Sequence, residues 1–251
     1  MARWLAEARP DLTFPQQAGD EAEVQIAYCP ERILPGRMLE ELVNNDRVVG
    51  GLSKRASAMA VVLYKMFVKG QVITTNAHTA EMCKLVENSF RDLNIAFANE
   101  LSMLCDKMNV DIEELIALAN RHPRVDILRP GIGVGGHCIA IDPWFLIESD
   151  PERAMLIRKA REVNTRKSQW VLEKIEQKIN SFAEIKHTGI PLKIACFGLT
   201  YKADIDDLRE SPALFIVASL SKKYSGSISV VDPWVKCLPE SLSTCEVALM
   251  E

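Results

Sequence analysis

The chain has 251 residues, of which 48% are hydrophobic and 25% charged, the composition of a globular protein with one or two domains. Its 34 acidic and 30 basic residues give a net charge of −4, which excludes bulk attraction to nucleic acid or anionic lipid. The seven cysteines form no Cys-x-x-Cys pair, and no run approaches the ~20 apolar residues of a membrane span. We therefore expect a soluble cytoplasmic protein without a metal, nucleic-acid or membrane partner.

A short strand is predicted over residues 24–28, where apolar and polar side chains alternate. It leads into Cys29-Pro30-Glu31-Arg32, which places Glu31 and Arg32 just after a strand, although a surface turn would also explain this polar pair. Residues 33–51 show an irregular or mixed pattern. A helix is then predicted over 53–67, followed by a short strand or turn at 72–75.

A long helix is predicted from about Asn76 to Met108, because this stretch lacks Pro and Gly and has apolar residues at helical spacing. Within it, Lys84, Asn88 and Arg91 fall at i, i+4 and i+7 and therefore share one face. A solvated stripe explains these side chains as well as a site that binds an anion or a developing oxyanion.

A glycine-rich segment, Gly131-Ile132-Gly133-Val134-Gly135-Gly136-His137-Cys138, is the most informative feature of the chain. Glycines let backbone N–H groups approach a ligand, so the thiol of Cys138 is a candidate nucleophile, with the carboxylate of Asp142 four residues later. The alternative is a small buried cysteine in a tight turn. The glycines also spell G-x-G-x-x-G, but we interpret this as a false match, because a dinucleotide site needs a strand before the motif and a helix after it.

The second half of the chain changes from helical to α/β patterning. A helix is predicted over 150–179 with Asp150 as its N-cap, and 187–191 is the predicted linker. Strands at 192–198 and 228–233 flank a helix that begins at Ser211-Pro212, which gives one βαβ unit with no third strand.

Four separated motifs resemble those of the UDP-glucose/GDP-mannose dehydrogenase family. They are Cys-Pro-Glu-Arg at 29–32, Lys84-x3-Asn88-x2-Arg91, Gly-Gly-His-Cys-x3-Asp at 135–142 and Lys202-x6-Arg-Glu-Ser-Pro. The chain has Ile141 where the glucose and GDP-mannose branches usually have Lys before the Asp, so it looks more like the UDP-N-acetylhexosamine branch. UDP-N-acetyl-D-mannosamine is the expected substrate, and UDP-N-acetylglucosamine is the alternative.

The resemblance implies oxidation of the sugar C6 alcohol to a carboxylate with NAD+, through a thiohemiacetal and a thioester on Cys138. In this reading Lys84 exchanges protons and stabilises the oxyanion, Asn88 assists it, and Asp142 and Glu31 position water and reacting groups. The resemblance also implies that Arg209 is a cofactor contact. The implied substrate contacts are Arg32, Ile33, Arg91, His122, Arg124, Gly135, Tyr201 and Lys202.

The expected fold class is α/β, with a mainly helical central dimerisation domain followed by an incomplete Rossmann-like C-terminal domain. The predicted divisions are 1–52, a remnant of the N-terminal NAD-binding domain; 53–186, the central catalytic domain; and 187–251, a truncated UDP-sugar-binding domain. Because no glycine fingerprint precedes Glu31, the main NAD-binding domain is expected to be absent and the activity impaired.

Two other classes of function remain open on the sequence. One is an inactive sugar-nucleotide-binding and dimerisation remnant. The other is a thiol acyltransferase that uses Cys138 without NAD. A homodimer through the central helices is expected for the family member and for the remnant.

Overall fold

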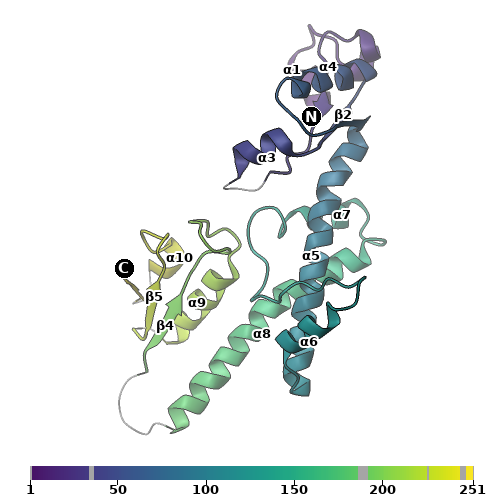
Figure 1. Cartoon of the computed structure of the whole chain (residues 1–251). Helices are drawn as coiled ribbons and strands as arrows, with labels where there is room; N and C mark the ends of the chain where they lie inside the picture. The colour runs from purple at the N-terminus through teal and green to yellow at the C-terminus, as the bar shows by residue number, and fades with distance from the viewer. Residues whose placement is uncertain (1, 34–36, 186–191, 225, 244–246, 251) are drawn as a thin grey trace. The chain divides into compact units, whose positions relative to one another are not determined.

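A computed structural model describes residues 2–33, 37–185, 192–224, 226–243 and 247–250 (Figure 1). The predicted linker at 187–191 lies outside the described residues. The chain divides into two compact units, 1–87 and 88–251. The predicted three-part domain division stays a prediction. Within the described ranges, no helix is both long and apolar enough to cross a membrane.

The first unit is built around a small three-stranded sheet. Its elements are α1 (Ala2–Ala8), α2 (Pro15–Ala18), the 3₁₀ turn η1 (Gly19–Glu21), β1 (Ala27–Tyr28), α3 (Met38–Asn44), β2 (Arg47–Gly51), α4 (Lys54–Lys65) and β3 (Val72–Asn76). Strand β2 pairs antiparallel with β1 and parallel with β3, so β2, α4 and β3 form a βαβ unit. Ser53 caps α4 as its side chain accepts the N–H of Ala56.

Strand β2 corrects the expectation that residues 33–51 are irregular or mixed. Its Arg-Val-Val-Gly-Gly sequence is a short apolar run that ends in two glycines, so neither alternation nor length identifies it as a strand. The glycines are required by packing: a Cβ on Gly50 would lie 2.6 Å from the Cβ of Ala80. The strand at 24–28 is shorter than predicted, because only Ala27 and Tyr28 pair with β2.

Helices dominate the first part of the second unit. The long helix α5 (Ala77–Met108) confirms the predicted element almost to the residue and continues from one unit into the other. It is followed by α6 (Ile112–Ala119), which Asp111 caps, then α7 (Asp142–Ser149) and α8 (Met155–Ile185). The predicted start of α8 at Asp150 is wrong. Asp150 ends α7, and its carboxylate accepts the N–H of Arg153 in the turn before α8.

The C-terminal part of this unit is a parallel sheet with helical crossovers. Its elements are β4 (Ile194–Phe197), α9 (Pro212–Lys223), β5 (Ile228–Val231), α10 (Glu240–Ser243) and β6 (Val247–Met250). Strand β6 pairs parallel with β5, so the expectation that a third strand is missing is wrong. The core contains Leu199, Leu220 and Val230, together with Leu172 from α8, so this sheet packs against α8.

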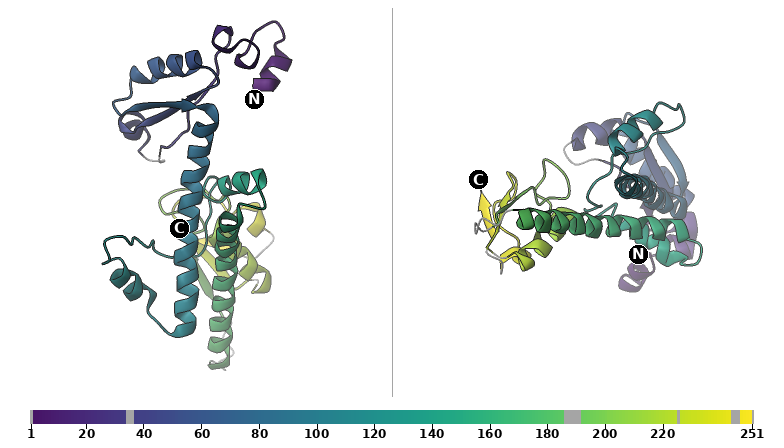
Figure 2. Two further views of the ribbon diagram at one scale, coloured as in Figure 1. Left: turned by 90° about the vertical axis from the view of Figure 1, so that its right-hand side faces the viewer. Right: turned by 90° about the horizontal axis from the view of Figure 1, so that it is seen from below.

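In Figure 1 α8 crosses α5, and in both views of Figure 2 the two helices lie side by side. Buried polar side chains lie along both helices, and hydrogen bonds join three of those on α5, Asp92, Asn99 and Ser102, to α8. We call these residues the polar seam. Its members on α5 are Asn88, Asp92, Asn99 and Ser102, and on α8 they are Arg161, Asn164, Lys167 and Ser168. Arg161 donates to Asp92 at 2.6 Å, and the Lys167 ammonium donates to Ser102 Oγ at 2.6 Å. Buried polar groups are costly unless they are paired, so these bonds fix where the helices cross.

We predict that Lys167 makes stability rise with pH. Burial lowers the pKa of Lys167 to about 8. In the unfolded chain this pKa is near the ordinary 10.5, so between pH 8 and 10.5 the unfolded state binds a proton that the folded state lacks. Stability should therefore rise over this window, by roughly 2–3 kcal/mol. Urea unfolding gives the free energy of unfolding at each pH for the wild-type chain and for Lys167→Met. The difference between the two pH dependences is the contribution of Lys167, and the same pH dependence in both proteins would contradict the prediction.

Candidate active site

The glycine loop, residues 131–138, is held at three points along its length. The N–H of Gly131 donates to Asn99 Oδ1 at 2.8 Å. The hydroxyl of Ser168 donates to the carbonyl of Ile132 at 2.8 Å, and the N–H of Gly136 donates to the carbonyl of Arg209 at 2.9 Å. The loop follows irregular backbone rather than a strand, which agrees with the rejection of a dinucleotide fingerprint.

Two glycines of the loop allow close contact with Tyr201. A Cβ on Gly135 would lie 2.6 Å from the Cβ of Tyr201, and one on Gly136 would lie 2.9 Å from its ring. Gly136 also has φ +83°, a backbone conformation that disfavours L side chains. The loop therefore needs glycine here to approach the segment that follows β4.

Cys138 lies at the end of this loop as a free, half-buried thiol. Its carbonyl accepts the N–H groups of Ile141 at 3.1 Å and Asp142 at 2.8 Å, so a tight turn joins the thiol residue to the start of α7. The carboxylate of Asp142 accepts a hydrogen bond from the amide of Asn88, which is 5% exposed. The structure thus links three predicted catalytic residues, Asn88, Asp142 and Cys138.

The segment between β4 and α9 carries an ion pair close to the thiol. The Arg209 guanidinium donates hydrogen bonds to Asp207, among them one from Nε at 3.0 Å and one from Nη2 at 2.6 Å. This pairing lowers the pKa of Asp207 to about 2 and raises that of Arg209. The pKa of Tyr201 is raised by burial, and next by the Asp207 carboxylate. The sequence analysis does not include Asp207 among the site residues. A carboxylate two residues before a candidate arginine is nevertheless a simple signal for an ion pair.

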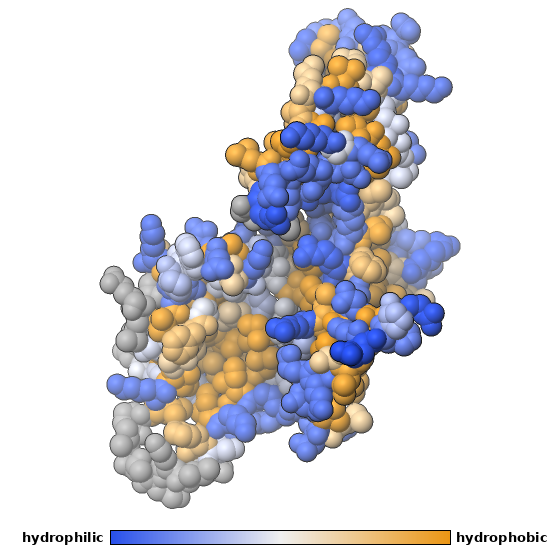
Figure 3. All heavy atoms as spheres, viewed as in Figure 1, coloured by the Kyte–Doolittle hydropathy of each residue, from blue (hydrophilic) through white to orange (hydrophobic). Residues whose placement is uncertain are grey.

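A pocket with a volume of about 390 Å³ lies beside the glycine loop. Its wall combines polar side chains of α8 with apolar side chains around α9, and includes Val134, Arg161, Ser168 and Phe215. Figure 3 shows hydrophobic side chains over α9 and the neighbouring part of α8. This pocket contains buried charge and lies next to the thiol loop.

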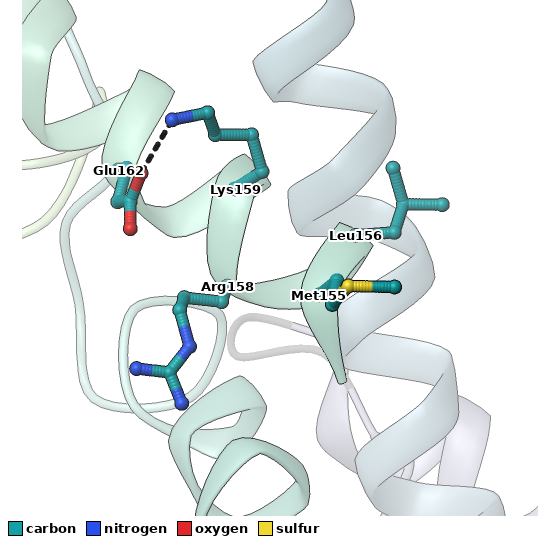
Figure 4. A pocket seen from close by; sticks show the side chains of 5 residues that line it. All are labelled: Met155, Leu156, Arg158, Lys159 and Glu162. Carbon is teal, nitrogen blue, oxygen red and sulfur yellow. Dashed lines mark hydrogen bonds and ion pairs between the residues drawn. The ribbon is translucent and has the colours of Figure 1, made fainter. Parts of the chain in front are cut away.

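A second hollow, at the start of α8, does not contribute to the candidate site. All of its lining residues come from this one helix: Met155, Leu156, Arg158, Lys159 and Glu162 (Figure 4). Lys159 and Glu162 pair with each other at 2.8 Å, while Met155 and Leu156 are largely exposed. It holds no nucleophile and none of the residues predicted to form the site.

Glu31, Arg32, Ile33 and Lys84 belong to the first unit. One carboxylate oxygen of Glu31 accepts the N–H groups of Arg32 at 2.7 Å and Ile33 at 2.8 Å. Arg32 forms an ion pair with Glu87 at 2.9 Å, and Lys84 is half-buried. A shared site for these residues and Cys138 stays a prediction.

Four other predicted substrate contacts belong to the second unit and are exposed: Arg91, His122, Arg124 and Lys202. The residues predicted to share one face of α5 therefore differ in environment, because Asn88 is buried while Arg91 is exposed. No hydrogen bond or ion pair within the described part of the chain joins His122 or Arg124 to the glycine loop. Their roles as substrate contacts stay predictions.

A metal ion and a dinucleotide pyrophosphate each need a particular set of groups around them. Among the described residues, no cluster of three or more His, Cys, Asp or Glu could hold a metal ion. In the βαβ unit, a pyrophosphate would need free N–H groups at the start of α4. There the N–H of Ala56 is bound by Ser53 at 3.0 Å and that of Arg55 by Asp20 at 2.9 Å. The residues at this turn therefore do not fit a pyrophosphate.

Comparison with protein families gives three matches in chain order. The NAD binding domain of the UDP-glucose/GDP-mannose dehydrogenase family matches residues 2–68, the central domain matches 78–166, and the UDP binding domain matches 195–250. The prediction that the NAD-binding domain is absent is therefore wrong. It relied on the glycine fingerprint alone, which occupies only the first βα turn of such a domain, whereas a later βαβ unit carries no such motif.

Similar proteins include two groups of curated enzymes. The UDP-N-acetyl-D-mannosamine dehydrogenase of Escherichia coli strain K12 is 55% identical over 100% of this chain and 60% of its own length. The NDP-N-acetyl-D-galactosaminuronic acid dehydrogenase of Ralstonia solanacearum is 56% identical over 98% of this chain and 57% of its own length. The chain thus spans about three fifths of the length of these relatives.

A solved structure, that of UDP-D-ManNAc dehydrogenase from Pyrococcus horikoshii, has the same fold. It matches with a TM-score of 0.82 and 40% identity, over 99% of this chain and 58% of the solved one.

We predict that Gly136→Ala disturbs the loop, whereas Gly131→Ala does not. The first variant combines a positive φ with a Cβ 2.9 Å from the Tyr201 ring, and should cost about 1–3 kcal/mol. A Cβ on Gly131 would meet only the carbonyl oxygen of Gly133, at 3.7 Å. Thermal unfolding of both variants tests this, and equal shifts in melting temperature would contradict it.

Proposed function

Because the chain belongs to the UDP-glucose/GDP-mannose dehydrogenase family, we propose that it carries the catalytic thiol of an NAD-dependent UDP-N-acetyl-D-mannosamine 6-dehydrogenase. The observation that carries the proposal is the linkage of Cys138, Asp142 and Asn88 at the end of the glycine loop. The similarity to UDP-N-acetyl-D-mannosamine dehydrogenases over the whole chain supports the choice of substrate.

In the proposed reaction two NAD+ molecules, bound in succession, would each supply the acceptor for one hydride. The C6 alcohol of the sugar loses a hydride and a proton to give an aldehyde, and the Cys138 thiolate adds to its carbon as a thiohemiacetal. Loss of a second hydride and a proton gives a thioester, which water hydrolyses to the carboxylate while the thiol is released. Asp142, oriented by Asn88, is suited to hold or deprotonate that water.

The remaining roles are assigned by family resemblance. Lys84 exchanges protons with the reacting oxygen, and Glu31 positions water. Arg209 contacts the cofactor. The sugar nucleotide is contacted by the predicted set Arg32, Ile33, Arg91, His122, Arg124, Gly135, Tyr201 and Lys202.

A second candidate reaction differs in the configuration of the sugar. The Ralstonia solanacearum relative, named for NDP-N-acetyl-D-galactosaminuronic acid, is as similar to this chain as the mannosamine enzymes. The corresponding UDP-N-acetylgalactosamine is therefore the competing substrate. Comparing kcat/KM for the two sugar nucleotides decides between them.

We predict that NADH forms with UDP-N-acetyl-D-mannosamine and NAD+, and that Cys138→Ser abolishes formation of the uronate. A hydroxyl lacks the nucleophilicity of a thiolate at neutral pH, so turnover should fall by about 10³-fold or more. Absorbance at 340 nm measures NADH, and mass spectrometry identifies the uronate. Cys105→Ser is the matched control, because it changes a buried cysteine outside the loop.

The control should keep its activity, and equal uronate formation by Cys138→Ser and the wild-type chain would refute the role of the thiol. If the chain alone forms no NADH, the same variants are tested after fusion to the portions of the Escherichia coli relative that this chain does not span. No turnover in that fusion, when the intact relative is active in the same assay, would refute the proposed reaction.

We also propose that the protein forms a homodimer through the central helices. Within the second unit, α5 exposes Phe90, Phe97 and Leu104 at intervals of seven residues, so they share one face. Their exposed fractions are 67%, 50% and 50%, and exposed apolar faces of this kind commonly mark interfaces.

We predict that Phe97→Lys weakens this dimer at least about tenfold, since a charge in an apolar interface must be desolvated. Glu113→Lys, at an exposed position on α6 rather than on this face of α5, should leave the dimer intact. Sedimentation equilibrium gives the masses. A wild-type chain that stays monomeric at tens of micromolar would contradict the prediction.

A further inference from the structure

Two seam residues contact the start of the glycine loop and have no role in the proposed chemistry. Asn99 is fully buried on α5 and accepts the N–H of Gly131 at 2.8 Å. Ser168 on α8 is 9% exposed and donates to the carbonyl of Ile132 at 2.8 Å. Gly131 is thus held by α5 through its N–H, and the next residue, Ile132, is held by α8 through its carbonyl.

The direction of the Asn99 amide is fixed by a chain of buried hydrogen bonds. The ionised Asp92 carboxylate can only accept, so Asn164 must present its NH₂ group to it, at 2.8 Å. The oxygen of Asn164 then accepts from the NH₂ group of Asn99 at 2.8 Å. The remaining oxygen of Asn99 is left to face Gly131. Arg161 pairs with Asp92 at 2.6 Å and so stabilises the carboxylate charge that orients Asn164 and, through it, Asn99.

Ser168 also lies against the loop at a second residue, Gly133. A Cβ on Gly133 would lie 2.1 Å from its hydroxyl oxygen, so loop and hydroxyl are in direct contact at a position where only glycine fits. Further along, the N–H of Gly136 is held by Arg209, and the turn from Cys138 leads to α7. With Gly136 held, the bonds at Gly131 and Ile132 fix the other end of this short segment, so losing either bond loosens the loop that leads to the thiol.

We propose that Asn99 and Ser168 are positioning residues for Cys138: they hold the start of the glycine loop so that the thiol faces its substrate. The inference rests on the proposed role of Cys138 as the nucleophile. Neither residue touches the reacting atoms. Their contribution is the geometry of the loop, and small displacements of a nucleophile reduce the rate strongly.

The test uses Asn99→Ala and Ser168→Ala in the full chain, with Ser89→Ala as the matched control. Ser89 is also a buried serine, on α5, but its hydroxyl has no hydrogen-bond partner among the described residues, so its removal leaves no group unpaired. Hydrogen exchange of a peptide covering 131–138 reports loop opening. The alkylation rate of Cys138 by iodoacetamide, followed by peptide mass mapping, reports exposure of the thiol.

In both loop variants, exchange and alkylation should rise about fivefold or more, because opening of the loop no longer breaks an anchoring bond. The Ser89→Ala values should stay at wild-type level. In an active preparation, kcat should fall about tenfold with KM changed less than about threefold. Should Asn99→Ala fail to fold, Ser168→Ala alone carries the test.

Unchanged loop exchange in the folded variants, or an equal rise in Ser89→Ala, would overturn the proposal. A fall in kcat without any change in the loop would overturn it as well. Exchange and alkylation do not require turnover, so failure of the positioning role is distinguishable from failure of the proposed reaction, which Cys138→Ser tests.

Discussion

The buried pair of Asp92 and Arg161 is the interaction on which the second unit depends. Removing a charge from water is expensive, and the cost is offset only when the partner and further hydrogen bonds are in place. Asp92 Oδ1 accepts hydrogen bonds from Arg161 and Asn164 of α8, whereas Asp92 Oδ2 and Arg161 Nε are buried without a hydrogen-bond partner among the described residues. Because burial raises the pKa of Asp92 while its two partners lower it, the ionised form relies on them. Polar contacts therefore help to specify where α5 and α8 cross.

The same helices connect that crossing to the rest of the unit. Helix α8 continues from the seam to Leu172, which packs into the core beneath α9. Helix α5 contributes Asn88 to Asp142 and Asn99 to the glycine loop. Residues 4, 7 and 11 positions apart on a helix share a face, so a single face of α5 supports both the acid and the start of the thiol loop. Fixing the crossing thus fixes the site.

The sequence predicts the elements whose signals are local. Thirty-two residues of apolar periodicity without Gly or Pro define α5, and Ser211-Pro212 correctly marks the start of α9. Strand β2 was missed because its short glycine-ended run has no period, and its place in a βαβ unit depends on pairing with β3. The roles of Asn99 and Ser168 were missed for a related reason. A polar residue in a helix is usually solvated, and only the partner helix shows that these are buried.

Arg209 shows how the loop and the charged segment beside it are coupled. Its carbonyl holds Gly136 while its guanidinium is paired with Asp207. The low pKa of Asp207, about 2, shows that this carboxylate stays ionised at neutral pH. An anion that binds Arg209 must therefore share the guanidinium with Asp207 or displace it. Since the guanidinium is largely exposed, sharing is possible at little cost in desolvation. Any backbone shift that accompanies displacement would act directly on Gly136, two residues before the thiol.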